Sequence, residues 1–346
     1  MGAKEYFSCF FITLCIGVKL SLNLNYQWDL VKLSDLTSSS TPEYVTDSYL
    51  FCIRLIYLSI ILTTVLFMLF DRTGFKLKLM SPQDKLIDVH LIGIQRFAAF
   101  TVWNWALQLF YFMLITFCTY IDKLDPTLQK YIAPYQWLLT RVAWGAFEIA
   151  FTMAFLVTIV VTFILIPSAI RKNAPYDNFY KVFPLLMHNF NVIFMVSELF
   201  LNKLPIILHH NSLCFFWGMT YTMFAMYWYW LHGYFFYFFL DFHKPFAPIW
   251  TLILIAIYSA LFTGGHYLSN MIRDSSNANA TLYKWSIAVF TVFIMKWPPR
   301  EKWHITTQDL CYYFPSLAPN KSTLANDTKA PQDDVALRRS SRKKST

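Results

Sequence analysis

Long runs of apolar residues, separated by short polar segments, dominate the pattern of this chain of 346 residues. Six of the runs are close to the roughly 20 residues that an α-helix needs to cross the hydrocarbon core of a bilayer. They are residues 48–70, 97–120, 144–166, 182–201, 213–231 and 249–267. A seventh run, 282–297, is shorter and carries Lys284 near its start and Lys296 near its end. The pattern predicts an all-α fold, a polytopic transmembrane helical bundle of six to seven spans.

Two polar segments flank this predicted bundle of residues 47–297. The N-terminal segment, 1–46, contains a short apolar stretch at 6–18 that fits a signal sequence, an interfacial helix or a marginal span. The C-terminal tail, 298–346, is basic and rich in Pro, Ser, Thr, Asn and Lys, so we expect it to be disordered.

Composition and charge support a membrane protein. The chain is 56% hydrophobic and only 14% charged, which excludes an ordinary soluble domain. Alternate loops carry nine and four Lys or Arg residues, and the loops with nine should be cytoplasmic. We therefore expect an integral protein of the plasma membrane or an endomembrane, with the basic tail cytoplasmic if the seventh run also crosses. The basic cluster of the tail is short and lacks aromatic residues, so no nucleic-acid partner is expected.

Two of the apolar runs carry polar residues along one helical face. Positions i, i+3 and i+7 lie on the same side of a helix. The second run presents Thr101, Asn104 and Gln108, and the fourth presents His188, Asn191 and Glu198. Polar side chains in a membrane bundle turn away from lipid, so we expect the two faces to meet, with Thr101 opposite His188.

This pairing suggests a hydrolytic site. A threonine hydroxyl becomes a useful nucleophile when a neighbouring imidazole takes its proton, so Thr101 and His188 are the candidate catalytic residues. The other four side chains, Asn104, Gln108, Asn191 and Glu198, are candidate binding residues that could orient the imidazole or the substrate. The expected partner is a membrane lipid, and the expected substrate is a fatty-acyl ester. The alternative is that the same residues form hydrogen bonds between helices, worth roughly 0.6 to 2 kcal/mol each.

No metal or other cofactor is expected. Membrane metal sites need several histidines at helical spacing, and this chain has eight histidines without an HxxH or HxxxH pair. We expect His209 and His210 to lie unburied at the membrane interface. The aromatic stretch 226–246 is typical of an interfacial belt of tyrosine and tryptophan.

A first family resemblance rests on the polar face of the second run. Thr101, Asn104 and Gln108 followed by an aromatic pair, together with a later run that opens on His188 and ends on Glu198, resemble the androgen-induced membrane hydrolases. Those proteins are multi-pass threonine hydrolases that cleave fatty acid esters of hydroxy fatty acids. The resemblance implies Thr101 as nucleophile and His188 as its partner.

A second resemblance covers much of the later chain. The motif of His188 and Asn191, LNKLP at 201–205 and FYFFLD at 236–241 are similar to the rolling stone-like multi-pass proteins linked to myoblast fusion. This likeness implies a non-enzymatic function in cell–cell interaction or fusion. A transporter is a weaker third alternative, because the sequence shows neither inverted halves nor paired spans broken by Gly or Pro.

Overall fold

The computed structural model describes residues 11, 13–15, 17–18, 21–22, 26–80, 86–172, 176–274 and 279–297. The chain divides into two compact units, Met1–Lys296 and Trp297–Thr346. The helical bundle is the first unit, and Trp297 is the described residue of the second. The predicted disordered tail and most of the apolar stretch 6–18 lie outside the described residues.

Long helices make up the described part of the first unit, which confirms the all-α prediction. They are α3 (Asp47–Phe70), α4 (Phe100–Thr119), α6 (Gln136–Val160), α9 (Asn191–Leu201), α10 (Asn211–His232), α11 (Ala247–Arg273) and α12 (Ala280–Ile294). Five helical stretches in the described residues are long and apolar enough to cross a membrane: Asp47–Phe70, Phe100–Leu124, Gln129–Arg171, Val182–Leu201 and Ala247–Arg273. The protein is therefore a multi-pass integral membrane protein.

The other two predicted spans are helical, but they differ from these five. Helix α10 has 22 residues, including several tyrosine and tryptophan side chains, and is not among the five stretches that are apolar enough to cross. Helix α12 has 15 residues. At 1.5 Å per residue it covers about 22 Å, which is less than the roughly 30 Å of a hydrocarbon core.

Three of the described spans contain a π-helical turn, and the second span ends in one, Tyr120–Leu124. Helix α6 begins at Gln136 and continues through the π-helical segment Val161–Leu165 into α7 (Ile166–Arg171). The fourth span is built from α8 (Val182–Leu185), the π-helical segment Leu186–Phe190 and α9. Such turns interrupt the regular ladder of hydrogen bonds and are frequent at functional sites. The π-helical segment Leu186–Phe190 contains His188.

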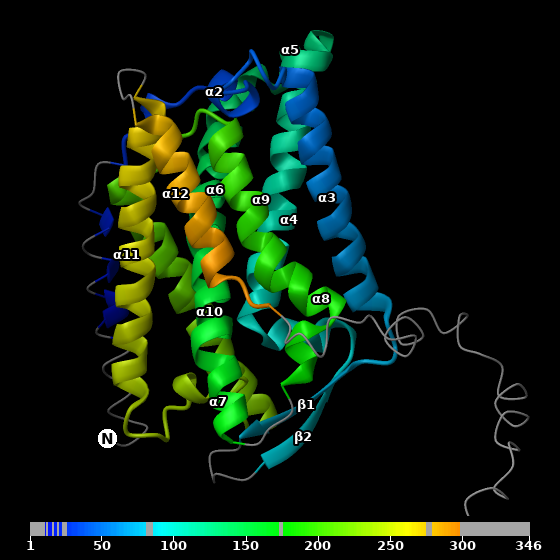
Figure 1. Cartoon of the computed structure of the whole chain (residues 1–346), viewed down its shortest axis with the longest axis vertical. Helices are drawn as coiled ribbons and strands as arrows, with labels where there is room; N and C mark the ends of the chain where they lie inside the picture. The colour runs from blue at the N-terminus through cyan, green and yellow to red at the C-terminus, as the bar shows by residue number, and fades with distance from the viewer. Residues whose placement is uncertain are drawn as a thin grey trace, which may run out of the picture. The chain divides into compact units, whose positions relative to one another are not determined.

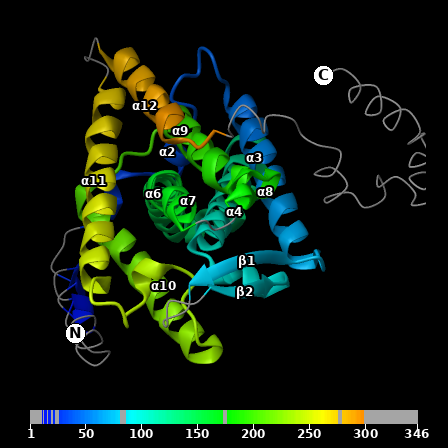
Figure 2. The same ribbon diagram turned by 60° about the horizontal axis from the view of Figure 1, so that its bottom comes forward.

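Helix α6 lies at the centre of the bundle. Figure 2 shows it among α4, α9, α10 and α11, and Figure 1 shows α3 on the outer side of α4. Small side chains at Ala143, Ala146, Ala150 and Ala154 follow one face of α6 and are almost fully buried. Small residues let neighbouring helices approach closely, which suits a central position.

A β-hairpin at one end of the bundle was not predicted from the sequence. Strands β1 (Phe75–Met80) and β2 (Leu86–Leu91) pair antiparallel, with Leu77 opposite Val89 and Lys78 opposite Asp88. Apolar residues alternate with charged ones along both strands, as expected for a sheet with one covered face. Val89 and Leu91 pack against Trp228 near the end of α10. The charged alternation was interpreted only as a basic loop, so the strand period was missed.

Short helices complete the description. They are α2 (Leu33–Thr37) and α5 (Gln129–Ile132). Both lie at the end of the bundle opposite the hairpin (Figure 1).

Candidate functional site

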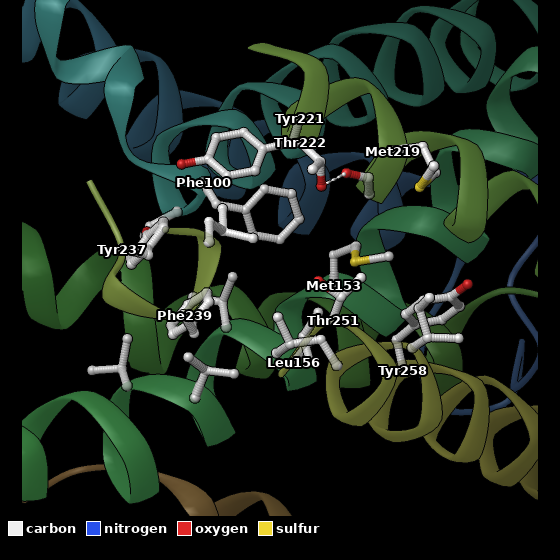
Figure 3. Close-up of a pocket in the computed structure, with 18 of the residues that line it drawn as sticks. Phe100, Met153, Leu156, Met219, Tyr221, Thr222, Tyr237, Phe239, Thr251 and Tyr258 are labelled. Carbon is white, nitrogen blue, oxygen red and sulfur yellow. Dashed lines mark hydrogen bonds between the residues drawn. The ribbon is translucent and has the colours of Figure 1, made fainter. Parts of the chain in front are cut away.

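An apolar pocket lies between α4, α6, α10, α11 and the segment that joins α10 to α11 (Figure 3). Its empty space, including the part open to the surroundings, is about 800 Å³. Aliphatic, methionine and phenylalanine side chains form most of the wall, and the polar side chains that reach it carry hydroxyl groups. A pocket of this size and lining suits an apolar ligand with one polar group.

Thr101 lies in the wall of this pocket. All six predicted site residues are in described parts of the chain, and of these six Thr101 alone lines the pocket. Its residue is 6% exposed and belongs to the first turn of α4, which begins at Phe100. The first N–H groups of a helix have no partner within the helix and favour negative charge nearby. Thr101 therefore lies at a position that favours developing negative charge.

Two tyrosines bring further hydroxyl groups to the same end of the pocket. Tyr221 donates a hydrogen bond of 2.7 Å to the carbonyl oxygen of Ala98, just before α4. Burial raises the pKa of Tyr237 to about 12, although the Thr101 side chain and the N–H groups of Phe100 and Thr101 face its hydroxyl and oppose the rise. Tyr237 therefore stays protonated at neutral pH and keeps a proton to donate.

His188 is buried at the hairpin end of the fourth span, and its hydrogen bonds join it to Lys296 and Thr158. Its Nδ1 lies 2.5 Å from Nζ of Lys296, and its backbone oxygen accepts a hydrogen bond from the Thr158 hydroxyl. No hydrogen bond joins His188 to Thr101, both of which the structure describes. His188 and Thr101 do share the hairpin end of the bundle. Asn178, ten residues before His188, donates to the backbone of Lys76 in β1, and α4 with Thr101 begins shortly after β2.

Lys296 has unusual surroundings for a lysine. The residue is 3% exposed, and within the described residues no carboxylate lies at ion-pair distance from it. Its Nζ is also 5.5 Å from the ring centroid of Phe179. If the amine is charged, it donates to Nδ1 of His188 and the ring proton is on Nε2; if it is neutral, it can accept from Nδ1 and leave Nε2 free. The charge of Lys296 therefore determines whether Nε2 of His188 can act as a base.

Asn104 and Gln108 are buried without a full set of partners. Both amide atoms of Asn104, and Oε1 of Gln108, have no hydrogen-bond partner among the described residues. The remaining amide nitrogen of Gln108 donates a bond of 3.3 Å to the backbone oxygen of Asn191. A buried polar group without a partner costs roughly 1 to 3 kcal/mol, so Asn104 does little to hold helices together, whereas Gln108 joins α4 to the fourth span by one hydrogen bond.

Asn191 has the opposite character. Its side chain accepts from the Thr158 hydroxyl at 3.3 Å and donates to the backbone oxygen of Ala154 at 3.4 Å. Both partners are on α6. These contacts join the fourth span to the central helix, as in the alternative interpretation of the polar face.

Glu198 belongs to a separate buried network. It forms an ion pair with Arg54 at 2.5 Å and accepts a hydrogen bond of 2.8 Å from Tyr111, and both charged side chains are fully buried. Arg54 also donates to Thr119 and to the backbone of Leu36. The network joins α2, α3, α4 and α9, and it uses the carboxylate of Glu198 in internal contacts.

One expectation about the histidines was wrong. His210 is fully buried, with Nδ1 2.5 Å from the carboxylate of Glu148 and Nε2 2.5 Å from the backbone oxygen of Tyr26. Trp28 stacks on the ring at a centroid distance of 4.2 Å. Polar partners for both ring nitrogens make burial affordable, and these partners are distant in sequence. His209 is exposed, as expected.

Tyr221, Tyr237 and Lys296 were not singled out from the sequence. The two tyrosines lie in or near a segment rich in aromatic residues, where nothing distinguishes a pocket hydroxyl from an interfacial one. Lys296 offered a signal, because a lysine in an apolar run is costly unless it has a polar partner. Within the described ranges, no three His, Cys, Asp or Glu side chains are grouped so that they could hold a metal ion.

The chain matches no protein-family model, no curated protein and no solved structure. The likenesses to the androgen-induced hydrolases and to the rolling stone-like proteins thus stay predictions from short motifs. What the site can do follows from its own geometry.

Proposed function

We propose that this membrane protein is an intramembrane hydrolase of fatty-acyl esters, with Thr101 as nucleophile and His188 as general base. The observation that carries the proposal is the position of Thr101 in the wall of an apolar pocket, at the first turn of α4. An acyl chain in this pocket would bring its ester group to the hydroxyl-rich end. The substrate would enter from the bilayer, in which the surrounding helices lie.

The proposed reaction has two steps. Thr101 Oγ attacks the ester carbonyl carbon while its proton passes to His188, and the C–O bond to the alcohol breaks as His188 returns that proton to the leaving oxygen. Water then attacks the acyl-threonine, and the fatty acid leaves. Both steps place negative charge on the carbonyl oxygen.

The hydroxyl of Tyr237 at the pocket end would stabilise that charge. It keeps its proton, and the N–H groups of Phe100 and Thr101 face its oxygen and position it. Donors fixed in advance at a developing oxyanion typically contribute about 10² to 10³ in rate. Tyr221 donates to Ala98 and so would position the first turn of α4 rather than bind the oxyanion.

The proposal requires His188 to reach Thr101 in the substrate complex. Catalytic hydrogen bonds are often long in structures without substrate and tighten only when it binds. His188 lies in a π-helical turn, where the backbone has room to adjust. Its Nε2 is available as a base when the amine of Lys296 is neutral and accepts from Nδ1.

The test is hydrolysis of a palmitoyl ester by the purified protein in lipid vesicles. Thr101→Ala should abolish the hydrolysis. Thr222→Ala is the matched control, because Thr222 also lines the pocket but donates its hydroxyl to Gly218 of its own helix. Equal loss in both variants, or no loss in Thr101→Ala, would overturn the proposal.

A second candidate is the non-enzymatic function in cell–cell interaction or fusion. The observation that favours it is the set of hydrogen bonds between Asn191 and two residues of α6, Ala154 and Thr158. Through these bonds, part of the polar face links two helices. If this function is the true one, expression on cultured cells should promote cell–cell fusion equally with wild type and Thr101→Ala.

A further inference from the structure

The pocket is elongated along the helices. Thr251 and Tyr258 both line it and are seven residues apart on α11, which is about 10 Å at 1.5 Å per residue. Figure 3 places Tyr237 and Tyr258 on opposite sides of the pocket. The end that contains Thr101, Tyr221 and Tyr237 is called the hydroxyl end below, and the end at Tyr258 the far end.

Helix α10 gives the direction of the far end. Asn211, at the start of α10, donates to the hydroxyl of Ser259, the residue after Tyr258. Residues of α10 that precede Tyr221 are therefore closer to the far end than Tyr221 is. Phe215 and Gly218 are two such residues, and both line the pocket.

The wall changes character between the two ends. Between the hydroxyl end and Tyr258 it is formed mostly by apolar side chains such as Leu156, Val157 and Leu254, with the flexible Met153 and Met219. Methionine adapts its shape to an apolar partner and tolerates a range of positions for it. Such a lining accommodates the methylene groups and the methyl end of a chain.

Gly218 is the point at which the pocket has room for another side chain. A Cβ atom added there would have no heavy atom within 4 Å, apart from its own chain neighbours and helix backbone. Gly218 precedes Tyr221 by one helical turn of about 5 Å towards the far end. A side chain added at this position would therefore begin in open space at the wall of the pocket.

We propose that the pocket binds one long acyl chain of a membrane lipid, with its carbonyl at the hydroxyl end, and that Gly218 sets the length of chain that fits. The carbonyl end rests on the proposed function, whereas the length limit rests on the cavity alone. A short chain ends before Gly218, and a long chain passes it to reach Tyr258. Gly218 is thus a specificity-determining residue for chain length.

The experiment uses two photoreactive probes, palmitoyl and octanoyl fatty acids that carry a diazirine and an alkyne, on the full-length protein in vesicles. Gly218→Leu should lower palmitoyl labelling about tenfold, the effect of exposing about two methylene groups, and leave octanoyl labelling unchanged. Gly264→Leu is the matched control, because an added Cβ there also meets no atom within 4 Å and Gly264 does not line the pocket. It should label as wild type does.

Each outcome decides the proposal. Palmitoyl labelling that is unchanged in Gly218→Leu, or equally reduced in Gly264→Leu, would overturn it, as would loss of both probes in Gly218→Leu. Measuring both hydrolysis and palmitoyl labelling separates this inference from the proposed function. If Thr101→Ala still hydrolyses esters while palmitoyl labelling follows Gly218, the hydrolase proposal fails and the acyl site stands.

Discussion

Lys296 Nζ lies 2.5 Å from Nδ1 of His188, inside the bundle. Among the described residues, no carboxylate lies within ion-pair distance of the lysine. The contact is held by the backbone as well, because the Asn189 side chain donates to the oxygen of Lys296 and accepts from its N–H. The end of α12 is thereby fastened to the turn that contains His188. A neutral amine that accepts a hydrogen bond from Nδ1 leaves Nε2 free to act as a base.

Lys296→Met should reduce ester hydrolysis about 2- to 10-fold, because it removes the neutral amine that accepts from Nδ1 and leaves Nε2 free, and such a hydrogen bond contributes about 0.5 to 1.5 kcal/mol. The backbone contacts with Asn189 remain, so the fold should be kept. Lys296→Arg adds a side chain that is always charged and can only donate, which places the ring proton on Nε2, so it should not recover the activity. A thermal unfolding curve measured beside the activity separates the two effects, and a drop in Tm that matches the lost activity would contradict the positioning role.

The Arg54–Glu198 pair should be structural. Glu198→Ala leaves Arg54 buried and unpaired, which should lower the free energy of unfolding by about 3 to 5 kcal/mol. The double variant Arg54→Met with Glu198→Leu removes both charges and should recover most of that loss. Tm in detergent measures both. If Glu198→Ala kept its Tm but failed to bind the palmitoyl probe, Glu198 would be a binding residue after all.

Asn104 gives the opposite expectation. Its amide has no partner among the described residues, so Asn104→Leu, which has a similar shape, should leave Tm unchanged or raise it. If Asn104 supports the reaction, hydrolysis should fall all the same. A clear fall in Tm would instead identify Asn104 as a link between helices.

How far sequence could lead differs between the fold and the site. The apolar runs predicted the long helices, because helix length and apolarity are local properties that the bilayer imposes. The polar face of α4 pointed to Thr101, which does line the pocket. Partners such as Lys296 for His188, or Glu148 for His210, could not be predicted, because they are 108 and 62 residues away in sequence. Only packing brings them together.

The ion pair between Asp71 and Arg96, at the hairpin end of the bundle, should make the stability of the fold depend on pH. Burial raises the pKa of Asp71, but hydrogen bonds from Thr73 and Arg96 outweigh it, so the pKa lies below its ordinary value. A lowered pKa in the folded state stabilises the fold above the unfolded pKa of about 3.9, and this contribution is lost as pH falls through the folded value. Tm should therefore fall as the pH drops below about 4.

Asp71→Asn is the control for this prediction. The variant should have a lower Tm than wild type at neutral pH and a smaller dependence on acid. A variant with the same acid dependence as wild type would show that other carboxyl groups cause the loss of stability.

The most direct measurement of the central claim is the site of reaction with a fluorophosphonate, a reagent that bonds covalently to activated serine and threonine hydroxyls. Wild type, Thr101→Ala, His188→Ala and the control Thr222→Ala would be labelled in membranes, and the adduct located by mass spectrometry. The account predicts an adduct on Thr101 that is absent from Thr101→Ala, about 10² to 10⁴ slower to form in His188→Ala, and unchanged in Thr222→Ala. A wild-type protein that remains unlabelled, or an adduct on another residue, would contradict it.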